Sequence, residues 1–439
     1  MAKVKEKPGI SKLIVGGFKS IAKRTEIEVR PLTVFCGANS SGKSSAMQPL
    51  LLMKQTLESP YDPGPLRLDG PNVRFTSSSQ FLCASNKQAS DFSIEFGVAL
   101  DNVSYFASTF SCAPNKSIDL ESMVIATDKV QPVKFIKGSS HKDLATLLKN
   151  TQPQTLQIDS KYTISLERSY FFFELQLGLA SQDEFYTFPH FYFRTIGQAS
   201  HDILNVIHIP GLRGNPARAY KLTATGPRFP GRFEEYTASI LHEWANSKDS
   251  RLKSIGNQLA ELGLTWKVAT KKTDDTQVEV QVGRLLKPTS GGGKDLVNIA
   301  DVGFGVSQTL PVLVALLTAE PNQLVYIEQP EIHLHPRAQF ALASCLVDAA
   351  KRGVRVVVET HSSQLLLGLQ TAIAQDMISP KHVLFHWFER DPMSGESKIS
   401  AVEPDSAGRF GDWPVDFDEA IMEAQTKYLD VAEAKVIES

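Results

Sequence analysis

The segment 37–44 constrains the fold more than any other part of this sequence. It reads Gly-Ala-Asn-Ser-Ser-Gly-Lys-Ser and fits the G-x-x-x-x-G-K-[ST] pattern of phosphate-binding loops. The apolar run 32–36 before it is typical of a buried central strand, and Met47, Leu50 and Leu51 after it follow helical spacing. A loop between such a strand and helix directs backbone amides at a phosphate group. The sequence therefore predicts an α/β fold that binds a nucleotide.

The residue types of this loop indicate how the nucleotide is held. Lys43 is expected to reach the β- and γ-phosphates, and Ser44 to ligate Mg²⁺. A simple solvated turn is disfavoured because both the strand and the helix are in place. The expected cofactors are ATP and Mg²⁺. The candidate nucleotide-binding residues are Gly37, Asn39, Ser40, Ser41, Gly42, Lys43, Ser44 and Ser45.

A second apolar strand, 324–327, ends in a carboxylate. Glu328 is placed to hold Mg²⁺ beside the phosphate loop, so the predicted metal ligands are Ser44 and Glu328. Glu331, His333 and His335 follow, and they suggest a separate metal cluster as an alternative. We disfavour that alternative, because period-two spacing before a proline indicates a loop.

Patterning along the chain predicts its organisation. Strand-like stretches from about 92 to 180 predict an antiparallel region, 233–262 has helical spacing, and Asp274-Asp275 marks a hairpin. The final third alternates between strands and helices, so we expect it to share a parallel sheet with the first third. The expected domains are an N-terminal ATPase lobe (1–200), an inserted helical and basic segment with a hairpin (201–295), a C-terminal ATPase lobe (296–390) and a tail domain (391–439).

The charge balance is nearly neutral, with 46 Lys and Arg against 48 Asp and Glu, which excludes a histone-like coat. Residues 211–232 nevertheless contain five cations and no acid: Arg213, Arg218, Lys221, Arg228 and Arg232. With the aromatic residues Tyr220, Phe229 and Phe233, they form a candidate patch for a nucleic acid backbone or a partner. One of these arginines reaching the nucleotide, and a merely solvated loop, are the open alternatives.

Cysteine usage and hydropathy indicate a soluble cytoplasmic protein that needs no membrane. Cys36, Cys83, Cys112 and Cys345 lie far apart and are expected to be ordinary buried thiols. The longest apolar run, 310–319, is half of the roughly 20 residues that a membrane helix needs.

Taken together, several motifs in order resemble the ABC-type ATPases of the SMC/RecF/OLD group, closest to bacterial AAA-type ATPases with a small C-terminal domain of unknown function. The motifs lie at 17–20, 39–45, 210–213, 301–308, 327–336 and 359–362, and the tail residues 412–419 resemble the ending of this subgroup. The resemblance implies an α/β fold: an ABC-type P-loop ATPase head with a mixed sheet, an antiparallel β-subdomain and an inserted helical arm or lobe.

The resemblance also implies roles for residues outside the phosphate loop. Gly303, Gly305 and Ser307 would form a signature element, with a helix starting near Gln308, that faces the γ-phosphate of a nucleotide held by another subunit. This implies a homo-oligomer, at least a dimer. His361 would be the switch histidine, Thr360 or Ser362 would cap the next helix, and Gln80 is the candidate for the metal-linked glutamine.

The sequence departs from the ABC pattern at position 329. The pattern has a glutamate after the strand-end acid, whereas Gln329 cannot accept a proton from water, so we expect slow hydrolysis unless Glu331 substitutes. The candidate catalytic residues are Glu328, Gln329, Glu331 and His361.

The resemblance implies a slow ATPase whose nucleotide-dependent assembly controls a separately encoded effector, a nuclease, as in Septu-like anti-phage systems. One alternative is a RecF-like or SMC-like repair ATPase that acts directly on DNA. Another is a nucleotide-dependent scaffold without turnover. A built-in nuclease is disfavoured, because Asp416 and Asp418 form the sole D-x-D after His361 and lie in a short tail.

Overall fold

A computed structural model describes residues 9–83, 93–100, 104–112, 117–127, 130–151, 162–179, 185–187, 192–285, 295–411 and 426–427. The whole tail 412–419 that resembles the subgroup ending, including Asp416 and Asp418, lies outside these residues. Within them, no helix is long and apolar enough to cross a membrane.

A six-stranded sheet carries the phosphate loop, and its strands come from both the first and the last parts of the chain. In spatial order its strands are β11 (Ile207–Ile209), β16 (Leu324–Glu328), β17 (Arg355–Glu359), β3 (Leu32–Gly37), β18 (Val383–Arg390) and β19 (Ser397–Val402). Neighbouring strands are parallel, except that β19 is antiparallel to β18. The expectation that the first and last thirds share one sheet is confirmed.

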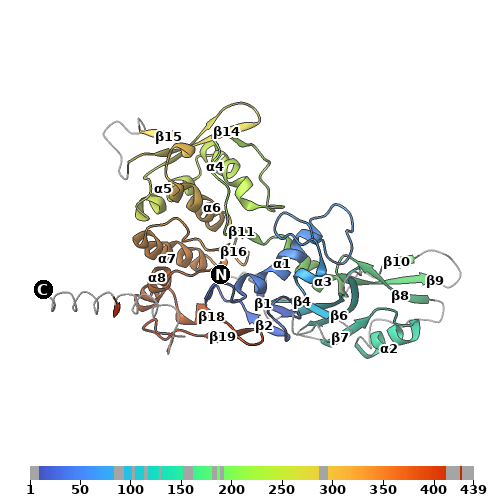
Figure 1. Cartoon of the computed structure of the whole chain (residues 1–439). Coiled ribbons are helices and arrows are strands. Elements are labelled where there is room, and N and C mark those ends of the chain that lie inside the picture. The colour runs from blue at the N-terminus through green and yellow to red at the C-terminus, as the bar shows by residue number, and fades with distance from the viewer. Residues whose placement is uncertain are drawn as a thin grey trace, which may run out of the picture.

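Each face of this sheet is covered, so its central strands are buried on both sides. Along β3, Val34 packs into one hydrophobic cluster and Phe35 into the other, and along β16 Ile327 and Tyr326 divide in the same way. Continuous apolar runs are what a doubly covered sheet requires. Helices α4 to α8 contribute to the first cluster, whereas α1 and the antiparallel strands contribute to the second (Figure 1).

The helices on the first face connect the strands of the sheet or belong to the insertion. They are α4 (Thr237–Asn246), α5 (Ser250–Glu261), α6 (Phe304–Thr318), α7 (Pro336–Lys351) and α8 (Ser363–Ala374). The helix expected near Gln308 begins one turn earlier, at Phe304, because Gly303 is the extended residue that precedes it. The helical stretch 233–262 is divided into two helices, and Asp249 caps the second by accepting a hydrogen bond from the amide of Arg251.

The antiparallel region lies on the second face of the sheet. One six-stranded sheet has the order β2 (Thr25–Glu28), β1 (Ile10–Gly16), β4 (Ser93–Leu100), β5 (Ser104–Ser111), β6 (Asp119–Thr127) and β7 (Val130–Ile136). A smaller sheet contains β8 (Tyr162–Ser169), β9 (Phe172–Leu179) and β10 (Phe185–Thr187). The helices of this half are α1 (Lys43–Leu57), α2 (His141–Thr151) and α3 (Tyr192–Leu204).

The inserted segment starts with a strand of the ATPase sheet, β11, and continues into a small sheet of its own. This sheet contains β12 (Tyr220–Lys221), β13 (Val268–Lys272), β14 (Gln277–Gly283) and β15 (Leu296–Asn298). Strands β13 and β14 pair in antiparallel register, so the expected hairpin is present. Figure 1 shows α4 and α5 beside these strands, above α6 and α7.

Candidate nucleotide-binding site

The phosphate loop connects β3 to α1 in a conformation that two glycines make possible. Gly37 and Gly42 have φ values of 138° and 105°. A Cβ atom would lie 2.2 Å from the carbonyl oxygen of Phe388 at the first position and 2.2 Å from the hydroxyl oxygen of Ser397 at the second. Only glycine fits such positions. The loop therefore wraps closely against β18 and β19 and leads directly into the N-terminus of α1.

Lys43 lies inside this loop, and its ammonium group bonds to the loop backbone. Its Nζ atom donates to the carbonyl oxygens of Gly37 and Ala38, over 2.9 and 2.8 Å. The side chain is 5% exposed, and this burial lowers the pKa of the ammonium, while the charge of Glu359 opposes the shift. A cation so placed meets phosphate oxygens at the mouth of the loop.

The loop forms one wall of a cavity of about 530 Å³, a size typical of small-molecule sites. Residues 39–45 line it together with Gln329, Glu359 and His361 on the side of the parallel strands. The rest of the wall includes Lys19, Ser20, Gln48, Gln80, Leu82, Cys83 and Arg390. The candidate glutamine Gln80 thus faces the same cavity as the phosphate loop, and its metal-linked role stays a prediction.

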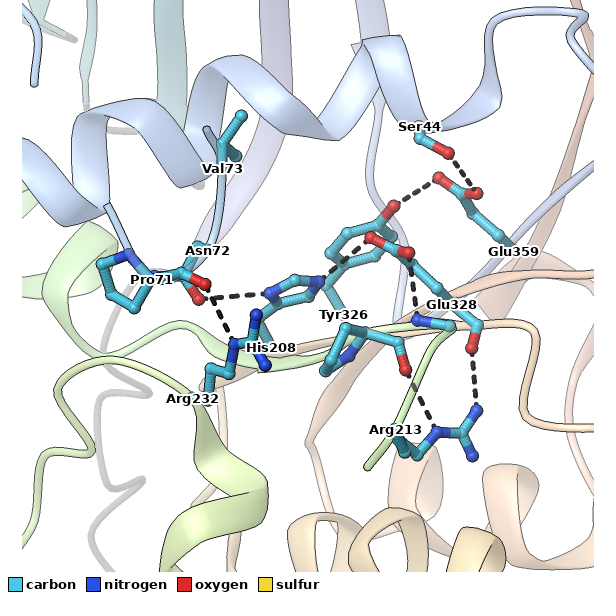
Figure 2. A network of polar contacts seen from close by, with 12 residues as sticks. Ser44, Pro71, Asn72, Val73, His208, Arg213, Arg232, Tyr326, Glu328 and Glu359 are labelled. Carbon is cyan, nitrogen blue, oxygen red and sulfur yellow. Dashed lines mark hydrogen bonds and ion pairs between the residues drawn. The ribbon is translucent and has the colours of Figure 1, made fainter. Parts of the chain in front are cut away.

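Two glutamates end neighbouring strands beside the loop, but they have different partners (Figure 2). In the parallel register, Glu328 of β16 is level with Glu359 of β17. Glu359 accepts a hydrogen bond of 2.9 Å from the Ser44 hydroxyl and another from the Tyr326 hydroxyl. The carboxylate that contacts the phosphate loop is therefore that of Glu359.

Glu328 is engaged on its other side. One carboxylate oxygen lies 3.0 Å from Nε2 of His208, and the other accepts a hydrogen bond of 3.1 Å from the backbone amide of Gly211. His208 in turn contacts Asn72 through Nδ1, over 3.2 Å (Figure 2). Glu328 therefore fixes the segment that follows β11, and it is not part of the cavity wall formed by the described residues.

The two carboxyl groups differ in acidity because their surroundings differ. Burial, and then the charge of Glu328, raise the pKa of Glu359 to about 7, while bonds from Tyr326 and Ser44 act in the opposite direction. Burial alone would also raise the pKa of Glu328, but the contacts with His208 and Gly211 hold it below its ordinary value. Neighbouring acids with separated pKa values are typical of functional sites.

Gln329 and Glu331 lie on different sides of the turn after β16. Gln329, with a φ of 43°, lines the cavity, and its amide donates to the carbonyl oxygen of Glu359 over 2.8 Å. Glu331 is 7% exposed and accepts hydrogen bonds from the hydroxyl of Thr360 and the amide of His361, over 2.7 and 2.9 Å. The structure thus brings Gln329 to the cavity and uses Glu331 to hold the turn that carries His361.

His361 also faces the cavity. Burial and the charge of Lys43 lower the pKa of its imidazole, although a hydrogen bond with Gly37 opposes them. The neutral imidazole therefore predominates at neutral pH. The next residue, Ser362, caps α8 by accepting a hydrogen bond of 3.0 Å from the Leu365 amide, as one of the two expected alternatives.

The signature residues lie around the start of α6, away from the cavity. Gly303 is exposed and precedes the helix, and the Ser307 hydroxyl donates to the carbonyl oxygen of Phe304 over 3.0 Å. None of the three, Gly305 included, lines the phosphate-loop cavity in the part of the chain that the structure describes. Ser307 borders a smaller cavity of about 180 Å³ with Tyr220 and Glu234.

Arg213 was expected in the basic patch that contacts a nucleic acid or a partner, but the structure shows that it is buried. The guanidinium is 9% exposed and donates to backbone carbonyl oxygens at four positions, Pro210, Gln308, Glu328 and Gln329, over 2.7–3.0 Å. It holds the site together and is not available to an external phosphate. Its burial lowers the pKa of the guanidinium.

The remaining cations of the segment are at the surface, but two of the aromatic residues are not. Arg218, Lys221 and Arg228 are exposed, and Arg218 pairs with Asp301 over 2.7 Å. Arg232 donates to the Pro71 carbonyl oxygen over 3.1 Å (Figure 2). Phe229 and Phe233 are buried and pack edge to face, so they cannot stack on bases.

Other expectations concern thiols and metal clusters. All four cysteines are buried, as expected. His335 caps α7, and among the described residues no group of three or more His, Cys, Asp or Glu could hold a metal ion. Residues 329–335 form turns between β16 and α7, so the preference for a loop at Glu331, His333 and His335 is confirmed.

Sequence patterns did not identify His208, Tyr326 or Glu359 as site residues. His208 belongs to a three-residue strand, and Tyr326 looks like any apolar strand residue. Glu359 carried the one available signal, a carboxylate at the end of a buried strand next to His361. That signal is the same as the one that singled out Glu328.

Family comparisons match both halves of this site. The family described as "AAA ATPase domain" matches residues 9–182, which contain the phosphate loop. The family described as "AAA domain, putative AbiEii toxin, Type IV TA system" matches residues 196–367, which contain β16, β17 and His361. Each match covers less than half of the chain, and the two are consecutive.

Individual proteins are similar over different extents. The Old nuclease of Escherichia phage P2 is 36% identical over 53 residues, which are 12% of this chain and 9% of that protein. An Smc head bound to the C-winged helix domain of ScpA has a TM-score of 0.44 and 12% identity, over 91% of this chain and 99% of its own. The SMC head domain from Thermotoga maritima has a TM-score of 0.38 and 12% identity, over 90% and 99%.

These comparisons bear on the resemblance to the SMC/RecF/OLD group. The AAA matches account for the motifs from the phosphate loop to His361, and the parallel sheet places those motifs around one cavity. The similarity to a small part of the Old nuclease agrees with them. Over residues 9–182 and 196–367 the chain is similar to AAA-type ATPase domains, and these two matches support an ATPase.

Proposed function

We propose that two copies of this ATPase close on ATP and Mg²⁺, hydrolyse the nucleotide slowly, and use the closed assembly to control a separately encoded effector. The observation that carries the assembly step is the position of the signature residues. Gly303 is exposed and lies away from the chain's own phosphate-loop cavity. A helix N-terminus at the surface is suited to a phosphate group that another subunit presents.

Within one chain, the loop amides, Lys43 and Ser44 bind the triphosphate and its metal. Mg²⁺ prefers oxygen ligands and is usually held by one or two carboxylates together with phosphates. The Ser44 hydroxyl and a strand-end carboxylate lie 2.9 Å apart at the cavity, so this donor set fits the ion. When bound, Mg²⁺ neutralises charge on the phosphates.

Slow turnover is inferred from Gln329, which lies on the cavity wall where an ABC-type ATPase has its water-activating glutamate. A glutamine side chain can orient a water molecule but cannot remove its proton. His361 and Gln329 would then position the water, and the closed state would last long enough to act as a switch.

The effector is inferred from the resemblance to Septu-like and OLD-derived systems, and we propose a nuclease that acts in anti-phage defence in the cytoplasm. The matched family names a toxin–antitoxin system and the similar phage protein is named a nuclease, which supports a role in conflict between phage and host.

A DNA repair ATPase is the second candidate, favoured by the exposed cations Arg218, Lys221 and Arg228. Phosphate release measured with and without DNA separates these functions. The repair function predicts stimulation by DNA, the effector function predicts slow release that DNA does not change, and a scaffold predicts no release.

A further inference from the structure

We propose that Glu359, and not Glu328, is the carboxylate that ligates the Mg²⁺ of bound ATP together with Ser44. This inference rests on the proposed binding of ATP with Mg²⁺. The proposed metal ligand then lies at the end of β17, the strand between β3 and β16, and Glu328 has a positioning role.

Three observations support Glu359 as the carboxylate that would ligate Mg²⁺. Its carboxylate accepts a hydrogen bond of 2.9 Å from the Ser44 hydroxyl, and a serine at this loop position is a Mg²⁺ ligand. Glu359 is part of the cavity wall along with Lys43 and Ser44. Strand β17 lies directly beside β3, with Glu359 level with Phe35 near the end of that strand.

Among the residues that the structure describes, no cation forms an ion pair with Glu359, although the charge of Lys43 acts on it from nearby. The carboxylate is 3% exposed, and its hydrogen bonds come from two neutral hydroxyls, those of Ser44 and Tyr326. The Lys43 ammonium bonds to carbonyl oxygens. A buried carboxylate without an ion pair is unfavourable, and a divalent cation at the cavity would compensate its charge.

Glu328 has the opposite character, because both of its oxygens already have partners. His208 contacts one oxygen from the side of β11, as Figure 2 shows, and the Gly211 amide donates a hydrogen bond to the other. Turning this side chain toward Ser44 would leave the partly buried amide of Gly211 and the buried imidazole of His208 without this partner. Glu328 is therefore a positioning residue that fixes the segment leading to Arg213.

The test compares the affinity of the full-length protein for AMP-PNP in excess Mg²⁺ and in EDTA. Glu359→Gln should lose at least about tenfold of the gain that Mg²⁺ gives to wild type, since even outer-sphere changes typically cost 10–100-fold in metal affinity. Its affinity in EDTA should be unchanged. Glu328→Gln should keep the gain from Mg²⁺, and so should Glu261→Gln, a control that removes an exposed carboxylate at the end of α5.

The opposite pattern, with the gain lost in Glu328→Gln and kept in Glu359→Gln, overturns this assignment and leaves the proposed function intact. A wild-type protein that binds no AMP-PNP in either condition overturns both. If circular dichroism shows that Glu359→Gln does not fold, Glu359→Ala decides, with Mn²⁺ replacing Mg²⁺ and bound Mn²⁺ counted by electron paramagnetic resonance. Loss of bound Mn²⁺ in the folded alanine variant, which has no carboxylate at this position, supports the assignment, and wild-type occupancy contradicts it.

Discussion

At the scale of single residues, Gln329 is the least expected feature of the site, because it indicates slow turnover. It lines the cavity together with Glu359 and His361, whereas Glu331 does not line the cavity and accepts a hydrogen bond from the Thr360 hydroxyl. We predict that Gln329→Glu raises phosphate release, by up to the 10²–10⁴-fold that a general base typically contributes. If Glu331 is the working base instead, Glu331→Gln will abolish release and Gln329→Glu will change little.

Lys43 provides the most direct residue-scale check of nucleotide binding. Its ammonium lies between the carbonyl oxygens of Gly37 and Ala38 at the cavity. Lys43→Ala should abolish ATP binding, measured by calorimetry, because it removes the charge that neutralises the β- and γ-phosphates. The fold should persist, and Lys381→Ala, at an exposed position, is the matched control. Unchanged ATP affinity in Lys43→Ala would refute the phosphate-loop assignment.

Glu359 gives the nucleotide-free protein a pH dependence. Burial and then the charge of Glu328 on β16 raise its pKa, and Tyr326, Ser44 and Lys43 oppose the rise. Its folded pKa of about 7 lies above the ordinary 4.5, so its contribution to stability is full below about pH 4.5 and is lost as the pH rises through 7. Relative to Glu359→Gln, wild type should lose roughly 3 kcal/mol of unfolding free energy between pH 4.5 and 8. Parallel urea-melt profiles for the two proteins would contradict this.

At the scale of elements, Arg213 joins the segment after β11 to α6 and to the turn after β16. Its donors reach four backbone carbonyl groups, and a lysine ammonium cannot match this planar geometry. Arg213→Lys should therefore lower the free energy of unfolding by about 2 kcal/mol, the scale of hydrogen bonds to charged groups. Arg228→Lys at the exposed end of the segment should change it by less than about 0.5 kcal/mol. Equal urea midpoints for the two variants would show that Arg213 is not structural.

Elements with strong local patterns were predictable from sequence, and those defined by long-range pairing were not. The strands β3, β16 and β17 and helices α1, α7 and α8 follow from buried runs and helical spacing next to recognisable turns. Strand β11 has three residues and carries no such signal, and β18 joins the sheet through pairing with β3, about 350 positions earlier in the chain.

The same reason explains which site residues were predictable. The phosphate loop, Gln329 and His361 stand in contiguous motifs, and the structure brings them to one cavity. The contacts of Glu359 with Ser44 and of Glu328 with His208 depend on the order β11-β16-β17-β3. Sequence spacing shows that two acids end two strands, but it does not show which strand is next to the loop.

At the scale of the whole molecule, the proposed switch requires two copies of the chain to close on the nucleotide. The start of α6 is exposed at Gly303 and Phe304, and Ser307 lies one turn further along the helix. Ser307→Arg introduces bulk and a misplaced charge at this surface. It should leave ATP binding by a single chain unchanged, because Ser307 does not line the phosphate-loop cavity.

The mass of the particle in solution, measured by analytical ultracentrifugation with ATP and Mg²⁺, tests this claim most directly. Wild type should form at least a dimer that dissociates when the nucleotide is removed, and Ser307→Arg should keep the mass of one chain under the same conditions while binding ATP normally. Equal masses for wild type and Ser307→Arg in the presence of ATP would contradict the nucleotide-closed assembly.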